Sequence, residues 1–237
     1  MKIKTQKGKI TKFLAAFALC AAIGSFSVTS AEQEQIPAEL DADTVEYNMT
    51  SGLVVATGDV LMKRGPGRVA GAKATYNVNT KEGFVEGNVV AVRENMRITC
   101  DKATTDGTEH MLAVGNVVGT QQDLKFTGEK VDYFPNQNQY MLIEKGGKIT
   151  NKDGVFTADK MEGWLGEEHY VGIGNAHLIS PPKDLEAGGD RLDYFAKEQG
   201  KAILTGNAWA VQNNNVVKSR RLILYLAESA GNNVSTQ

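Results

Sequence analysis

The sequence predicts an all-β protein of about thirteen antiparallel strands, built from two-strand repeats of roughly 29 residues. Three observations lead to this fold class. Two short signatures recur along the chain with one shared spacing. Apolar and polar residues alternate within both signatures, which is the period of a half-buried strand. The stretches between them are short and polar, and helical periodicity is nearly absent from them.

The first signature is a Gly followed by Asn or Asp and then by small apolar residues. Its copies are separated by 29, 28, 31, 28 and 32 residues, counting a weaker copy in fourth place. This regularity indicates a stack of similar units. The glycines of the clear copies are Gly58, Gly87, Gly115, Gly174 and Gly206, and the weaker copy begins at Gly146.

The second signature precedes the first in each unit and reads acid, base, aliphatic, polar and then often Tyr. Its clearest copies are residues 129–133 and 190–194. The aliphatic position advances in steps of 29, 29, 28, 30, 31 and 30 residues, so two independent columns share one period. The residues of this aliphatic column are Val45, Ala74, Ala103, Val131, Met161, Leu192 and Leu222.

Each signature predicts one strand. The second signature alternates over five residues, as in 44–48, and the first runs through its Gly-Asn pair, as in 53–62 or 202–211. A Gly inside a strand marks a bulge or a bend, and Asn or Asp tolerates the left-handed backbone that a bulge requires. Because the alternation continues across the pair, a bulge is favoured over a tight turn. Repeated at one level, the bulges would curl the sheet.

The connectors and the composition limit the architecture further. Short polar connectors such as 77–83, 135–139 and 197–200 imply antiparallel neighbours. Strands with one apolar face fold into two facing sheets or one curled sheet. The inward side chains are mostly small, so the two faces either approach closely or leave room for a ligand.

The N-terminus has the pattern of a secretory signal peptide. Five lysines precede the apolar stretch 13–23, and small residues at 27–31 then precede a polar run. We expect cleavage after Ala31 and a single domain over 32–237. The alternative is an uncleaved N-terminal anchor; a lipoprotein attached through Cys20 is disfavoured because Leu19 is too bulky for the preceding position.

Removing residues 1–31 makes the chain acidic. Lys plus Arg falls from 26 to 21 while Asp plus Glu stays at 28, which gives a net charge near −7. Nucleic-acid binding is therefore not expected, since it requires a basic surface. Cys100 becomes the sole cysteine, so no intrachain disulfide can form, and we expect this thiol to be a packing residue.

Residues with catalytic or metal-binding spacing are lacking in the sequence. None of His110, His169 and His177 has a second ligand at metal-site spacing, and Glu167-Glu168-His169 reads as a turn with its charges in solvent. There is no Gly-x-Ser-x-Gly, phosphate loop or dinucleotide fingerprint. The sequence therefore predicts no enzyme, no metal and no cofactor. An enzyme that degrades polysaccharides would need clustered acids in a cleft, and no such cluster stands out.

The motifs Ala-x-x-Val-Glu-Tyr, Val-Val-Ala-Thr-Gly-Asp-Val and Gly-Asn-Val-Val, repeated behind a signal peptide, resemble the OstA-like family. That family comprises periplasmic lipopolysaccharide-transport bridge proteins and the related jellyroll domains of their inner-membrane and outer-membrane partners. The resemblance covers Asp41 to Leu226. It implies an open, twisted antiparallel β-jellyroll in the periplasm, with the acyl chains of lipopolysaccharide (lipid A) in an apolar trough and the sugars in water.

The resemblance also implies the partners. Domains of this family join end to end by edge-strand pairing, so we expect inner-membrane and outer-membrane jellyroll partners, or head-to-tail contacts between copies. The residues expected to line the trough are the inward apolar ones: Val45, Tyr47, Val54, Val60, Met62, Tyr76, Val85, Val89, Val117, Val131, Tyr133, Leu178, Leu192, Tyr194, Leu204 and Ala208.

Three alternatives stay open in the sequence. The chain is longer than one minimal bridge domain needs, so it is either one long jellyroll or two short ones joined near 146–154. A structural or adhesive surface β-solenoid without lipid is the alternative function, although two unlike strands per unit suit an antiparallel meander better. The basic column is either a solvated strand face or a set of contacts to lipid phosphates; it consists of Lys73, Lys102, Lys130, Lys160, Arg191 and Arg221.

Overall fold

A computed structural model of the chain describes residues 38–93, 95–107, 110–121, 124–134, 136–152, 154–196, 198 and 200–226. The predicted signal peptide lies outside these residues. The described part forms sixteen strands and one short 3₁₀ segment, and none of its helices is long and apolar enough to cross a membrane. The strands are β1 (Ala38–Asp41), β2 (Thr44–Asn48), β3 (Leu53–Arg64), β4 (Gly67–Asn77), β5 (Glu82–Arg93), β6 (Met96–Asp106), β7 (Met111–Gln121), β8 (Leu124–Phe134), β9 (Tyr140–Ile143), β10 (Gly147–Asn151), β11 (Gly154–Ala158), β12 (Lys160–Trp164), β13 (His169–Ser180), β14 (Leu185–Phe195), β15 (Lys201–Gln212) and β16 (Asn215–Tyr225), with η2 at Pro181–Lys183.

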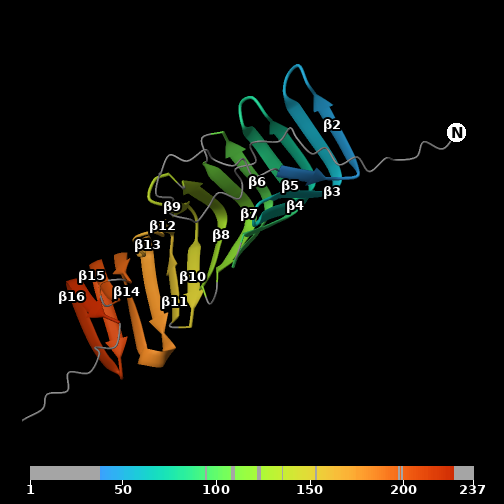
Figure 1. Ribbon diagram of the computed structural model, residues 1–237. Helices are drawn as coiled ribbons and strands as arrows, with labels where there is room; N and C mark the ends of the chain where they lie inside the picture. The colour runs from blue at the N-terminus through green and yellow to red at the C-terminus, as the bar shows by residue number, and fades with distance from the viewer. Residues whose placement is uncertain are drawn as a thin grey trace, which may run out of the picture. The chain divides into compact units, whose positions relative to one another are not determined.

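The chain divides into two compact units, residues 1–122 and 123–237. In the first unit β3 to β7 form an antiparallel meander, and β1 and β2 pair with the two halves of β3 (Figure 1). In the second unit β13 to β16 form a similar meander. Since every described pair is antiparallel, the parallel β-solenoid considered above finds no support, and the predicted open, twisted antiparallel jellyroll is confirmed.

Three of the long strands are broken in two. The first half of β8 pairs with β10 and its second half with β9, while β13 pairs with β11 and β12 in the same divided way. Thus β9 and β10 are two halves of one long strand, as are β11 and β12, and β1 and β2. With each broken strand counted once, the described residues contain the predicted thirteen strands. One break contains Gly146, the weak copy of the signature, at φ +60°.

The Gly-Asn signature forms a β-bulge, as the alternation predicts. The pairing register shifts across it, for example between Thr205 and Ala208, and Gly206 and Asn207 both have positive φ, at +70° and +48°. Such a backbone favours Gly and Asn over other residues. The bulge divides each strand that carries the signature into two halves, and the register shift divides its paired strands at the same level.

The acid that opens the second signature contacts the bulge of the next strand along the chain. Asn116 donates a hydrogen bond from Nδ2 to Asp101 at 3.0 Å, and Asn207 does the same to Asp190 at 3.1 Å. The glycine is required for this approach, since a Cβ at Gly206 would lie 2.8 Å from Cγ of Asp190. The two repeated columns are therefore one structural motif, which places a bend at the same level in several strands.

The inward faces of the two strand halves bury one another. On β3, Val54 and Ala56 before the bulge and Val60 and Met62 after it are all 1–5% exposed. The two halves meet in this unit at Gly71, which is paired with Val60 after the bulge, because a Cβ there would lie 2.5 Å from Cγ1 of Val85, which precedes the bulge of β5. In the second unit the ring of Phe156 reaches the opposite half at Gly172, where a Cβ would lie 2.5 Å from Cζ.

Candidate functional site

The candidate site is the inward apolar face that the alternation predicts. Of the sixteen residues expected there, twelve are buried, with 9% or less of their surface exposed. Tyr47, Leu178 and Tyr194 are half-buried, and Val45 on the short β2 is 36% exposed. Contact between these residues and lipid stays a prediction. The twelve buried residues are Val54, Val60, Met62, Tyr76, Val85, Val89, Val117, Val131, Tyr133, Leu192, Leu204 and Ala208.

The inward residues form rows that run across the strands, because directly paired residues point to the same face. In the first unit one row contains four alanines and a single valine, so its side chains are small. A row in the second unit is bulkier and contains Ile, Met and Leu. The first row is Ala56, Ala74, Val85, Ala103 and Ala113; the second is Val131, Ile143, Met161, Gly172, Leu192, Leu204 and Leu222.

Several inward residues were not identified from the sequence. Ile143 and Met161 are 0% and 1% exposed, and Phe126 and Phe156 are also buried. Ile143, Phe126 and Phe156 belong to the stretch that surrounds the weak signature at Gly146, where no clear Gly-Asn pair sets the phase of the alternation. Met161 belongs to the aliphatic column but was not among the residues expected to line the trough. The available signal was the short apolar run of residues 140–143 and the apolar residues within 154–158.

Buried polar side chains on this face stay neutral. Burial raises the pKa of Tyr76 to about 12, so its phenol remains protonated at neutral pH. Cys100 is 6% exposed, and burial, followed by the nearby Asp101 carboxylate, raises the pKa of its thiol to about 11. Both effects suit an apolar face without nucleophilic chemistry.

We expect Cys100 in the folded protein to resist alkylation by iodoacetamide at about pH 8, because the thiolate is the reactive form. Mass spectrometry of the native protein should show almost no adduct after a time that modifies the urea-unfolded chain completely. Rapid modification of the native protein would contradict the burial of this thiol.

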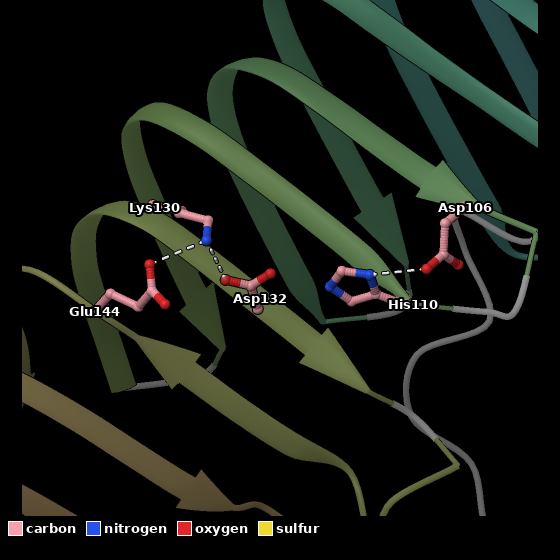
Figure 2. Close-up of polar contacts among 5 residues, drawn as sticks. All are labelled: Asp106, His110, Lys130, Asp132 and Glu144. Carbon is pink, nitrogen blue, oxygen red and sulfur yellow. Dashed lines mark hydrogen bonds and ion pairs between the residues drawn. The ribbon is translucent and has the colours of Figure 1, made fainter.

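The outward face of the second unit carries the basic column in ion pairs. Lys130 Nζ lies 3.0 Å from Glu144 Oε2 and 3.2 Å from Asp132 Oδ2 (Figure 2). The hydrogen bond to Glu144, followed by that to Asp132, raises the pKa of Lys130. Arg191 donates two hydrogen bonds to Asp193, at 2.7 and 2.8 Å. These pairs favour a solvated strand face over lipid-phosphate contacts for this column.

The Arg191–Asp193 pair predicts a weak acid dependence of stability. Hydrogen bonding to Arg191 lowers the pKa of Asp193 below its usual 3.8, so the pair contributes stability above that value and loses it as pH falls further. Arg191 is 46% exposed, so we expect a contribution below about 1 kcal/mol. The free energies of unfolding of wild type and Asp193→Asn, measured with urea, should differ at about pH 6 and converge towards about pH 2. A difference that grows with acid would contradict this assignment.

An aromatic row lies on the same outward face. The centroids of Trp164 and His169 are 5.0 Å apart and those of His169 and Phe195 are 4.2 Å apart, both pairs stacked. Phe134 and Tyr140 continue the row beyond Trp164. The expectation that Glu167-Glu168-His169 is a solvent-exposed turn is wrong for His169, which begins β13 and is held between two rings.

In comparisons with known proteins, one family model matches part of the chain. Residues 68–169 match the model described as "LptA/(LptD N-terminal domain) LPS transport protein". A similar solved structure is LptH, the LptA homologous periplasmic component of the lipopolysaccharide transport device of Pseudomonas aeruginosa. It is 19% identical, the match covers 45% of this chain and 80% of that chain, and the TM-score is 0.41. A search of curated proteins found no match.

Proposed function

We propose, from the premise that residues 68–169 carry a domain of the LptA/LptD N-terminal family, that this protein binds lipopolysaccharide in the periplasm. It would carry the acyl chains of lipid A on its inward face between the inner and outer membranes. The observation that supports this most is the inward face itself, whose apolar rows extend from strand to strand in both units.

The energetics are compatible with lipid entry. Residues such as Val60 and Leu204 are 0–1% exposed, so an acyl chain has to replace contacts between the two strand halves. Burying about ten methylenes contributes roughly 8 kcal/mol. Uncovering three or four Val or Leu side chains costs about 1.5–3 kcal/mol each. The two terms are similar in size, which suits a carrier that must also release its lipid.

The two terminal edges carry opposite charge. Residues 38–48 contain Glu39, Asp41, Asp43 and Glu46 and no basic residue, whereas β16 contains three basic residues and no acid. Val217 and Tyr225 of β16 are 53% and 63% exposed. An edge strand offers unpaired backbone groups to another chain. We infer that these edges join jellyroll partners at the two membranes, or other copies head to tail.

Photo-crosslinking tests the lipid site. A photoreactive residue at Val60, Val89 or Leu204 in chain 32–237 should form adducts with lipopolysaccharide. The controls are the exposed outward positions Glu46 and Glu144. Adducts at the controls alone would exclude the inward face as the binding site. In the native organism, depletion of the protein should cause lipopolysaccharide to accumulate at the inner membrane.

Reversing the charge of the C-terminal edge should weaken association between copies. We expect Arg220→Glu with Arg221→Glu to shift the protein towards monomer in analytical ultracentrifugation, because both edges would then be acidic. Raising the salt concentration should weaken wild-type association in the same direction. Unchanged association in the double variant would show that these edges do not meet.

A further inference from the structure

Trp209 lies on the outward face of the second unit, over a glycine of the neighbouring strand. It is paired across the strands with Gly188, where an added Cβ would lie 2.9 Å from both Nε1 and Cε2 of the indole and 3.0 Å from Cζ2. The neighbouring Ala208 and Ala210 point inward and are 1% and 6% exposed. The indole therefore contacts Gly188 on the outward face, and because Trp209 is only half-buried, part of the ring stays exposed to solvent.

Hydrogen-bonding groups lie on both sides of this indole. On the β13 side, the ring centroid of His177 is 5.7 Å from that of Trp209, and its Nε2 is 2.8 Å from Oε1 of Glu186. The side chains of His177 and Glu186 are 34% and 51% exposed. On the other side, Lys218 of β16 is paired with Trp209 and is exposed.

The core of the fold does not require a tryptophan at this position. The residues at the same place after the bulge in β3 and β5 are Leu61 and Val90. Their partners on the preceding strand are Asp41 and Ala70, each of which has a side chain where β14 has Gly188. An aliphatic residue on a partner with a side chain thus suffices in the first unit. The combination of an indole and a bare glycine beneath it points to a role in binding.

We propose that Trp209, with His177, Glu186 and Lys218, binds a pyranose ring of an oligosaccharide. The apolar C–H face of the sugar packs on the exposed part of the indole, and its hydroxyls hydrogen-bond to the carboxylate, imidazole and ammonium groups around it. A pyranose is favoured over an acyl chain, because hydrogen-bonding and charged side chains rather than apolar ones flank the indole. This inference rests on the proposed function for one of two sources of the sugar, the saccharide of lipopolysaccharide; the other is the glycan of peptidoglycan.

The chain carries a convenient probe for this site. Its only tryptophans are Trp164 and Trp209, so 5-fluorotryptophan labelling of chain 32–237 gives two ¹⁹F NMR signals, assigned with Trp164→Phe and Trp209→Leu. Lipid-free core oligosaccharide of lipopolysaccharide is titrated in one arm and an N-acetylglucosamine oligomer in the other. We expect one arm or both to shift the Trp209 signal saturably while the Trp164 signal stays in place.

The variants separate binding from folding. Trp209→Leu should keep its thermal unfolding transition, because Leu61 occupies the equivalent position, and should abolish saturable sugar binding measured by calorimetry. Glu186→Gln and His177→Ala should weaken binding without loss of folding, since both side chains are exposed. Trp164→Phe is the matched control and should bind as wild type does. If Trp209→Leu does not fold, the test of the site is whether Glu186→Gln and His177→Ala weaken sugar binding while they remain folded.

Three outcomes would overturn the site. The Trp209 signal would not respond to either sugar, or Trp209→Leu would bind as wild type does, or the signal would respond to phosphatidylethanolamine–phosphatidylglycerol vesicles and to no sugar. Failure here is distinguishable from failure of the proposed function. Crosslinking of lipopolysaccharide at Leu204 with no sugar binding at Trp209 overturns this site alone, and the reverse result overturns the lipid proposal alone.

Discussion

Replacing Gly206 by alanine should lower the free energy of unfolding by about 3 kcal/mol, and the same replacement at Gly146 by only about 1 kcal/mol. Both glycines have positive φ, +70° and +60°, so both variants carry the cost of an alanine in the left-handed region. The difference arises from what the new methyl group meets. Gly146 has nothing within 4 Å, whereas a Cβ at Gly206 would lie 2.8 Å from Cγ and 2.9 Å from Cβ of Asp190.

The clash at Gly206 cannot be relieved by rotating the carboxylate alone, because the Cβ of Asp190 is itself too close. Asp190 has to move, and its hydrogen bonds from Asn207 at 3.1 and 3.2 Å are lost with it. Hydrogen bonds to a charged group contribute about 1.5–3 kcal/mol to stability. Because the hydrogen bonds between Asn207 and Asp190 are exposed, we expect a contribution at the lower end of this range. Asp190→Ala removes the hydrogen bonds without the clash and should fall between the two glycine variants.

Urea unfolding followed by circular dichroism measures all three variants. Equal losses at Gly206 and Gly146 would show that only the backbone conformation matters at these positions. A loss in Asp190→Ala as large as that in Gly206→Ala would place the whole effect in the hydrogen bonds. Either result would contradict a motif in which acid and bulge are in contact.

The bulge could be predicted from the sequence because both of its requirements are local. Gly next to Asn signals left-handed backbone, and alternation continuing across the pair excludes a simple turn. The contact between Asn207 and Asp190 could not be predicted in this way. It joins residues 17 apart, and it depends on the pairing register of the two strands, which local sequence does not determine. The sequence shows two signatures that repeat with one period. Only the structure shows that the acid of the second signature accepts a hydrogen bond from the Asn of the first.

The least predictable parts lie where the repeat weakens and on the outward face. Around Gly146 no clear Gly-Asn pair sets the phase, so the inward Ile143 was missed. Met161 belongs to the aliphatic column but was not among the residues expected to line the trough. The outward face does not have to be apolar, so a tryptophan there, such as Trp209, looks like any half-exposed strand residue. Its importance depends on Gly188 in the neighbouring strand, and such pairs follow from the register rather than from local periodicity.

Replacing Phe156 by alanine should lower the free energy of unfolding by about 3 kcal/mol. Lipopolysaccharide should then raise the free energy of unfolding of this variant by more than it raises that of wild type. The ring of Phe156 is 8% exposed and reaches from β11 to Gly172 in the opposite strand half. Its removal leaves a cavity between the inward faces of the two halves. If acyl chains bind there, they fill that cavity and displace fewer protein contacts than in wild type.

Val171→Ala is the matched control, because Val171 is 0% exposed yet lies on the outward face, paired with Glu162 and Asp193. Val171→Ala should lose about 1–2 kcal/mol of stability. Lipid should stabilise this variant by no more than it stabilises wild type. Lipid at a free concentration of 100 times its dissociation constant adds about 2.7 kcal/mol to the free energy of unfolding of any variant whose affinity is unchanged. Thermal unfolding with and without lipopolysaccharide therefore has to show an excess in Phe156→Ala alone. An equal gain in Phe156→Ala and Val171→Ala would mean that lipid binds somewhere other than between the strand halves at Phe156.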